Sequence, residues 1–126
     1  DIVILEIGAN DGLRGIDTAL VERNIDTILQ RLQENNVITV LAGMKMVRNL
    51  GEEYTREFDS IYPRLAEKHQ VIFMPFFLEG VASDPSLNGD DGIHPNESGY
   101  KIITENIYPY VVLAIEQLKR SSRNNS

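Results

Sequence analysis

The chain is 126 residues long, carries a formal net charge of −7 and contains no cysteine; 42% of its residues are hydrophobic and 25% are charged. This length fits one domain, and the composition is ordinary for a globular protein. The negative charge argues against nucleic acid or an anionic membrane surface as a partner, and the absence of cysteine excludes disulfides, thiolate metal sites and a cysteine nucleophile.

The first half of the chain predicts a strand, a loop, a helix and a second strand. A nearly continuous apolar run begins at Ile2 and ends at Ile7, which is typical of a strand buried on both faces in a parallel sheet. The segment 8–15 is expected to form a loop. Apolar residues at helical spacing then predict a helix over residues 18–34 with Asp17 as its N-cap, and segment 37–41 predicts the next strand.

The second half continues the alternation. Its predicted elements are, in order, a loop over 44–50, a helix over 52–69, a strand over 71–74, a long loop over 76–95 and a last helix. Asn96 is a candidate N-cap of that helix, Pro109 is expected to kink or divide it, and the polar tail 121–126 is expected to fray. Such alternation predicts an α/β fold with a parallel sheet and right-handed crossovers. No apolar run reaches the ~18 residues of a membrane-spanning helix, so no transmembrane segment is expected.

A histidine and an aspartate are candidate catalytic residues in the loop before the last helix. Ligands bind at the carboxyl ends of the strands in open α/β sheets, and this loop reaches that edge. Asp91 precedes His94 by three residues, so the carboxylate can orient the ring while the other ring nitrogen acts as a general base. The alternative is a surface histidine at a turn, because the D-x-x-H pattern is short and common.

An asparagine reaches the same edge directly after the first predicted strand. The Asn10 side chain can donate N–H groups to an oxyanion, although a Gly/Asn/Asp turn without a catalytic role is the alternative. Met44 and Met46 either line an apolar pocket or pack in the core, and His69 at a helix end is interpreted as structural. There is no Gly-rich phosphate loop, and a single usable histidine argues against a metal site, so no cofactor is expected.

Two motifs carry a resemblance to a known family. The segments LEIGANDGLRG (5–15) and DDGIHPN (90–96) resemble conserved blocks of the SGNH (GDSL-type) hydrolases, in particular the bacterial thioesterase I/arylesterase/lysophospholipase group. GEEYTREFDSIYPRLAEKH and MPFFLEGV also resemble this group, so the resemblance covers essentially the whole chain. It implies a three-layer, flavodoxin-like α/β fold with a parallel sheet, truncated at the N-terminus, in which residues 1–126 form the C-terminal two-thirds of a single domain.

The resemblance also implies a reaction. This family hydrolyses carboxylic esters or thioesters through an acyl-serine intermediate without a cofactor, and the substrate here would be a small acyl or aryl ester. By resemblance, Asn10 belongs to the oxyanion hole, His94 is the general base and Asp91 orients it. The compartment stays open: the absence of cysteine fits the cytoplasm or the periplasm, and the resemblance favours a periplasmic or secreted protein.

The serine nucleophile of this family is not found in the chain. The G-D-S-L-like block is absent, as is the block with a glycine oxyanion donor, and Ser83 and Ser86 lie in the wrong element. We therefore expect a missing N-terminal segment to supply the serine and this chain alone to be inactive. Without that segment, the strand from Ile2 to Ile7 needs a strand-pairing partner, either the missing segment or a second copy of the chain.

Two other readings of the sequence remain. The first is a non-catalytic α/β module that retains the SGNH fold and only binds acyl or aromatic ligands; the residues encoded before Asp1 would distinguish it from the hydrolase. The second is an acidic signalling receiver domain, which is disfavoured because Asp90 and Asp91 come near the end of the chain rather than after its first strand.

Overall fold

A three-stranded parallel sheet in the order β1-β2-β3 lies at the centre of the fold in the computed structural model, which describes residues 1–46 and 50–124. β1 (Ile2–Glu6) pairs with β2 (Ile38–Ala42), which pairs in turn with β3 (Ile72–Met74). The register places Leu5 opposite Leu41. Because all three strands run the same way, their carboxyl ends meet at one edge of the sheet.

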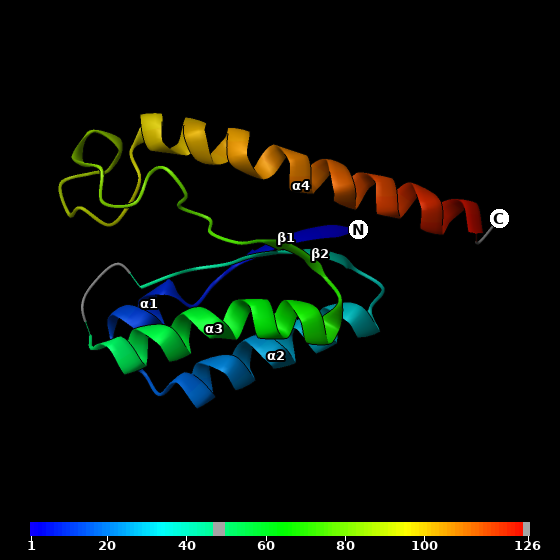
Figure 1. Cartoon of the computed structure of the whole chain (residues 1–126). Coiled ribbons are helices and arrows are strands. Elements are labelled where there is room, and N and C mark those ends of the chain that lie inside the picture. Colours follow the sequence, from blue (N-terminus) through cyan, green and yellow to red (C-terminus); the bar gives the residue numbers. More distant parts are fainter. Residues whose placement is uncertain (47–49, 125–126) are drawn as a thin grey trace.

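The sheet separates two helical layers (Figure 1). α2 (Thr18–Glu34) and α3 (Glu52–His69) cover one face, and α4 (Glu97–Asn124) covers the other, where it packs on β2 and β3. The core between the sheet and the α2–α3 layer consists of Val21, Ile25, Leu29, Leu41, Met44, Phe58, Ile61, Tyr62, Leu65 and Ala66. This is the three-layer α/β arrangement that the family resemblance implies, with only three strands among the described residues. None of the described helices has the length and apolar character needed to cross a membrane.

The long amphipathic helices are confirmed. α2 and α3 begin and end at the predicted residues, and β2 and β3 lie within one residue of their predicted bounds. Both predicted caps also form: Asp17 accepts a hydrogen bond from the Ala19 N–H at 3.0 Å, and Asn96 accepts one from the Gly99 N–H at 3.0 Å. These caps satisfy N–H groups that have no partner inside the helix.

Three predictions about the loops and the last helix are wrong at least in part. The predicted loop 8–15 contains a short helix, α1 (Ala9–Leu13), because the Gly12 N–H reaches back to the Gly8 carbonyl at 3.0 Å. Of the two effects expected at Pro109, division of the helix does not occur, because Pro109 lies at an exposed position and the segments on either side stay packed on the sheet. The helix continues through residues 121–124 of the tail that was expected to fray, and residues 125–126 lie outside the described residues.

The long connections match the predictions in part. Residues 44–46 have no regular structure, as expected for the predicted loop 44–50, but residues 47–49 of that loop lie outside the described residues. The loop before α4 contains one short 3₁₀ helix, η1 (Pro85–Leu87), whose N-cap is Asp84.

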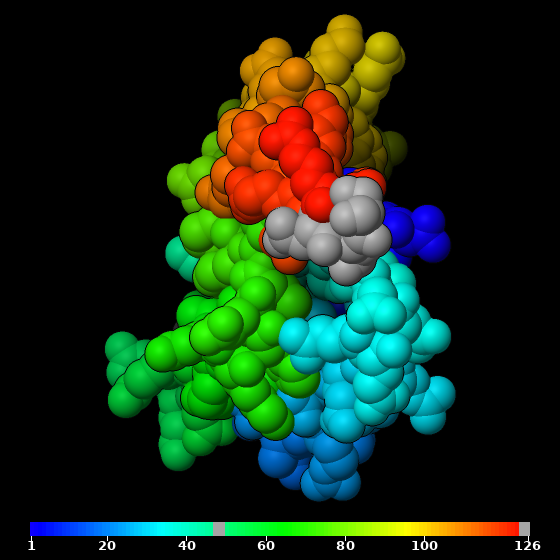
Figure 2. All heavy atoms as spheres, turned by 90° about the vertical axis from the view of Figure 1, so that its right-hand side faces the viewer, coloured from blue at the N-terminus to red at the C-terminus, as the bar shows by residue number. Residues whose placement is uncertain are grey.

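The expectation that β1 is buried on both faces is wrong. In the described chain β1 pairs with β2 alone, and Ile4 is 44% exposed and Ile7 39% exposed. The reason is that α4 lies over β2 and β3 and leaves the β1 end of that face uncovered. α4 itself exposes Tyr108 (67%) and Ile115 (40%). Figure 2 shows the first residues of the chain at the side of the molecule, below α4.

Candidate active site

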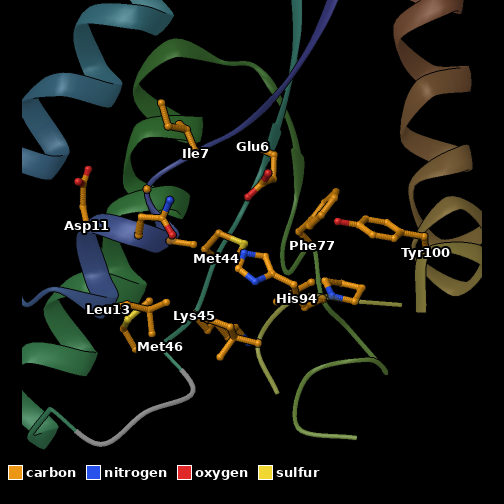
Figure 3. A pocket seen from close by; sticks show the side chains of 16 residues that line it. Glu6, Ile7, Asp11, Leu13, Met44, Lys45, Met46, Phe77, His94 and Tyr100 are labelled. Atoms are coloured by element: carbon orange, nitrogen blue, oxygen red, sulfur yellow. The ribbon is translucent and has the colours of Figure 1, made fainter. Parts of the chain in front are cut away.

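A pocket of about 460 Å³ opens at the carboxyl ends of β1 and β2 (Figure 3). Its lining comes from residues 6–11 and Leu13, from residues 44–46 after β2, from residues 77–78, from residues 93–95 and from Tyr100 of α4. This is the edge of the sheet where the sequence places the candidate catalytic groups. Segments from far apart in the chain therefore enclose one site.

His94 points into this pocket (Figure 3), and its ring contacts the carboxylate of Asp91, which is not part of the lining. Nδ1 of His94 lies 2.5 Å from Oδ2 of Asp91, and the other carboxylate oxygen accepts the backbone N–H groups of Ile93 and His94 at 3.0 Å each. These hydrogen bonds, the one from the His94 ring first, hold the pKa of Asp91 well below its usual range. Nε2 of His94 has no hydrogen-bond partner among the described residues, so it is available to a ligand in the pocket.

The loop that carries this pair is fastened at both ends. Asn88 and Pro95 form an antiparallel bridge, and the Gly89 N–H donates to the His94 carbonyl at 2.8 Å. Asn88 is buried and its side-chain amide donates to the carbonyls of Val81 and Asp84, each at 2.8 Å. The histidine therefore lies on a loop whose backbone is fixed by hydrogen bonds, although its side chain is 68% exposed.

Asn10 reaches the same pocket from the short helix α1. The N-cap of α1 is Gly8, whose φ of 104° lies in the left-handed region. A side chain there would be strained and would also collide with the Tyr62 hydroxyl, so only glycine fits this turn. The turn sends the chain from the end of β1 directly into α1. As expected from the sequence, Asn10 and His94 line one pocket.

Among the other lining residues, two methionines were candidates from the sequence, whereas the aromatic residues and Glu6 were not. Met44 and Met46 line the pocket, and Met44 is also part of the core, so both interpretations hold for it. Phe77 and Tyr100 add aromatic surface, and no local pattern marks them because only the tertiary fold brings their loop and helix to the strand ends. Glu6, the last residue of β1, also lines the pocket, and partial burial raises the pKa of its carboxyl.

No serine lines the pocket within the part of the chain that the structure describes. Ser86 is engaged elsewhere, because its hydroxyl donates to Asp84 at 2.6 Å. Ser83 lies outside the lining as well. Among residues 1–46 and 50–124, no group of three or more His, Cys, Asp or Glu side chains is arranged to hold a metal ion.

The second histidine lies outside this pocket. Nε2 of His69 contacts Asp26 at 2.6 Å, and Nδ1 contacts the Gln33 amide oxygen at 2.8 Å. Its side chain is 8% exposed. These contacts tie α3 to α2, as expected for a structural histidine.

The sequence resembles known hydrolases over most of its length. Residues 1–102 match the GDSL-like lipase/acylhydrolase family. An arylesterase of Vibrio mimicus is 38% identical over 105 residues, and thioesterase 1/protease 1/lysophospholipase L1 of Escherichia coli strain K12 is 38% identical over 103 residues. The matched region covers 83% and 82% of this chain but 52% and 50% of these relatives. The chain thus spans about half the length of the curated relatives it matches.

Solved structures show the same fold. A crystal structure of TesA has a TM-score of 0.84 at 31% identity, with 90% of this chain and 63% of that chain covered. AlinE4, described as an SGNH-hydrolase family esterase, has a TM-score of 0.69 at 42% identity, with 90% and 60% covered. The parallel three-stranded sheet corresponds to a shortened form of the SGNH-hydrolase fold. The chain belongs to the GDSL-like lipase/acylhydrolase family.

Proposed function

We propose that the complete protein, meaning this chain together with a segment that supplies a serine, hydrolyses carboxylic esters or thioesters through an acyl-serine intermediate. The observation that carries the proposal is the 2.5 Å contact between His94 Nδ1 and Asp91, on a loop that brings His94 into the same pocket as Asn10. A base with its orienting carboxylate and an oxyanion donor are the parts that such a reaction requires besides the nucleophile. The esterase and thioesterase names of the relatives support it.

The first half of the reaction forms the acyl-enzyme. Nε2 of His94 takes the proton of the serine hydroxyl while the serine oxygen attacks the acyl carbonyl carbon. The carbonyl oxygen becomes an oxyanion, which the Asn10 side-chain amide stabilises by donating an N–H group. The imidazolium then gives its proton to the leaving oxygen or sulfur as that bond breaks, so an alcohol or thiol departs and the acyl-serine ester remains.

The second half repeats these roles with water. His94 takes a proton from the water molecule as it attacks the acyl carbon, and the same oxyanion site holds the second tetrahedral intermediate. The serine oxygen leaves with the proton from His94, which releases the carboxylic acid. Asp91 stays ionised throughout, because its hydrogen bonds hold its pKa low, and it stabilises the imidazolium in both halves.

The lining favours an apolar acyl or aryl group. Leu13, Met46, Phe77 and Leu78 contribute apolar surface on several sides of the pocket. Burying such a group in this surface stabilises the complex by about 25 cal/mol per Å² of apolar area removed from water. We therefore propose a small acyl or aryl ester as the substrate class.

We further propose that the serine arrives on a strand that pairs with the outer edge of β1. A strand parallel to β1 on that edge would end beside Gly8 and Asn10, at the mouth of the pocket where the nucleophile is needed. The exposed side chain of Ile4 gives such a segment an apolar surface to cover. Residues 1–126 then form the C-terminal two-thirds of one domain.

The first experiment tests the activity. The complete protein is expected to hydrolyse a short-chain aryl ester and to be labelled by a serine-directed phosphonate on a residue outside residues 1–126, whereas the 126-residue chain alone is expected to be inactive. Binding of aryl esters by the complete protein without turnover would instead support a non-catalytic module. Turnover by the chain alone, with the label on Ser83 or Ser86, would contradict the assignment of the nucleophile.

The second experiment tests the strand edge. The isolated chain at micromolar concentration is expected to associate in light scattering, and the serine-bearing segment, when added, is expected to replace the self-association with a one-to-one complex. Ile4→Lys should weaken both the self-association and the complex with the added segment, because a lysine on an edge strand opposes strand pairing. Leu20→Lys is the matched control, since Leu20 is equally exposed (43% against 44%) but lies on α2. A monomer with no affinity for the segment would contradict the proposal.

A further inference from the structure

An aromatic stripe on α3 faces the segment that carries Asn10. Tyr54, Phe58 and Tyr62 follow one another at four-residue spacing, which places them on one face of the helix. The ring centroids of Tyr54 and Phe58 are 6.4 Å apart and those of Phe58 and Tyr62 are 5.7 Å apart. The three rings therefore form one packed row along the helix.

The row contacts the start of the Asn10 segment through Tyr62. The Tyr62 hydroxyl donates to the Ile7 carbonyl at 2.8 Å, and Tyr62 is 1% exposed. Burial raises the pKa of Tyr62, so the hydroxyl keeps the proton that it donates. Gly8 follows Ile7 and has room only for a hydrogen atom against the same hydroxyl. Tyr62 therefore fixes the chain at the point where it turns into α1.

The row contacts the end of the segment through Tyr54. The Tyr54 hydroxyl donates to the Ile16 carbonyl at 2.6 Å, and burial, followed by the charges of Asp11 and Asp17, raises the pKa of this phenol as well. The two tyrosines thus hold the backbone on both sides of α1, at residues 7 and 16. Each hydrogen bond joins residues far apart in the sequence, so neither forms unless α3 is packed in place.

The middle of the segment rests on Phe58. A Cβ atom at Gly12 would collide with the Phe58 ring and with Met46. Met46 is itself held, because its N–H donates to the Asp59 carboxylate at 2.9 Å. α3 therefore contacts the segment at its start, its middle and its end.

α1 has little means of holding itself in place. It is five residues long and has no side-chain cap hydrogen bond at its N-terminus, and isolated helices of this length are unstable in water. An oxyanion donor works only when its N–H groups are held within about 0.5 Å of the productive position. The position of Asn10 relative to His94 must therefore come from contacts outside α1.

We propose that Tyr62 and Tyr54 are positioning residues, which act through Asn10 by clamping both ends of the segment that carries it. This inference rests on the proposed hydrolytic function, in which Asn10 stabilises the oxyanion. Neither tyrosine lines the pocket, so neither is a catalytic residue.

Removal of each hydroxyl tests the clamp. Tyr62→Phe in the complete protein is expected to lower kcat roughly tenfold with KM within about twofold, less than the ~10²-fold that a 1 Å misplacement costs. In an Asn10→Ala background, the same substitution should lower kcat less than about twofold, because the group through which Tyr62 acts is gone. Tyr54→Phe, at a less buried site, is the second variant and should show the same pattern with a smaller effect. The inference would be overturned if Tyr62→Phe lowered kcat by the same factor in the parent and in the Asn10→Ala background.

Two further measurements separate the clamp from general stability and from the proposed reaction. Ile61→Val weakens packing at a buried position of the same helix and should leave kcat unchanged below the unfolding transition. Hydrogen exchange should quicken at the amides of Gly12 and Ile16 in Tyr62→Phe but not in Ile61→Val. If the unsubstituted protein hydrolyses no ester, the proposed function fails. Hydrogen exchange still tests the positioning role of Tyr62 in that case, because it does not depend on activity. Unchanged protection of the Gly12 and Ile16 amides in Tyr62→Phe would overturn that role.

Discussion

The chain has two histidines, and each holds an aspartate at nearly the same distance: His94 lies 2.5 Å from Asp91 and His69 lies 2.6 Å from Asp26. The surroundings differ. The His69 side chain is 8% exposed, and the Gln33 amide oxygen occupies its second nitrogen. The His94 side chain is 68% exposed, and its second nitrogen has no partner in the described chain.

This difference shows what a histidine–aspartate contact does and does not indicate. A short distance to a carboxylate is common to both pairs and therefore does not identify a catalytic site. In the proposed mechanism the base needs one nitrogen held and the other open to a pocket, and His94 meets both conditions. His69 has neither an open nitrogen nor a place in the pocket lining. The predictions below test this distinction, from the largest expected effect to the smallest.

The first prediction compares the two histidines directly. In the complete protein, His94→Ala and Asp91→Ala should each lower kcat by roughly 10⁴–10⁶-fold, the scale of the losses found when a histidine or aspartate of such a triad is removed. His69→Ala should leave kcat within about threefold of the parent at a temperature where the variant is folded, because it removes no group from the pocket. Steady-state kinetics on an aryl ester measures all three. A His94→Ala variant that stays within about threefold would show that His94 is not the base.

The second prediction concerns Asn10, which completes the site around His94. Asn10→Ala should lower kcat by roughly 10²–10³-fold, the usual scale for one oxyanion donor. KM should change little, because this hydrogen bond strengthens only as negative charge develops on the carbonyl oxygen. Asn10→Asp is a matched comparison, since it keeps the shape but replaces the amide donor with a carboxylate. A rise in KM with unchanged kcat would instead indicate a binding role.

The third prediction concerns the structural pair. Asp26→Ala should lower the free energy of unfolding at pH 7 by about 1–3 kcal/mol, because it leaves the nearly buried His69 ring without its acceptor. Glu22→Ala, which removes an exposed ion pair to Arg64 between the same two helices, should cost about 0–1 kcal/mol. Urea denaturation monitored by circular dichroism measures both. Equal losses of unfolding free energy in the two variants would show that the burial of His69 does not make its contact with Asp26 more stabilising than an exposed ion pair.

The pH dependence of the Asp26 effect has a definite sign. The hydrogen bonds from His69 and then Lys68 lower the pKa of Asp26 in the folded chain. A carboxyl with a depressed pKa stabilises the fold at any pH above its unfolded value, and this contribution is lost as the pH falls through the folded value. The difference between parent and Asp26→Ala should therefore shrink as the pH falls below about 4. A difference that stayed unchanged down to about pH 2 would contradict the assignment.

The sequence predicts those features that are determined locally. The bounds of α2 and α3 follow from apolar spacing and turn residues, and Asp17 and Asn96 are recognisable caps. His94 and Asn10 are found because polar residues at strand ends point to the ligand edge of a parallel sheet. What the sequence misses depends on contacts between distant segments.

α1 illustrates the limit. Its five residues include a glycine and carry no apolar period, so the segment predicts a loop, and its helical form depends on the Gly8 turn and on contacts with α3. Phe77 and Tyr100 are ordinary apolar residues in their own segments and become pocket residues only when the strand ends and α4 come together. The exposure of Ile4 does not follow from the apolar run itself, since such a run does not reveal how many neighbours its strand has.

The smallest expected effect lies at the end of the sheet opposite the pocket. Thr39 of β2 lines a hollow there together with Gln33, the residue that holds His69. Thr39 is 3% exposed, and its hydroxyl has no hydrogen-bond partner among the described residues. Such a buried hydroxyl is destabilising, and valine has almost the same shape without the polar atom. Thr39→Val should therefore raise the free energy of unfolding by about 1 kcal/mol and leave kcat of the complete protein unchanged.

Thr39→Ser is the matched control for this last prediction. It keeps the hydroxyl and removes the methyl group, so it should lower the free energy of unfolding by about 1 kcal/mol through lost packing. Opposite signs for the valine and serine variants in urea denaturation would show that the hydroxyl is unsatisfied. Destabilisation by both would show that the hydroxyl makes a favourable hydrogen bond in solution. In that case the Thr39 hydroxyl, like the His69 ring, has a hydrogen-bond partner, and the open second nitrogen of His94 differs from both.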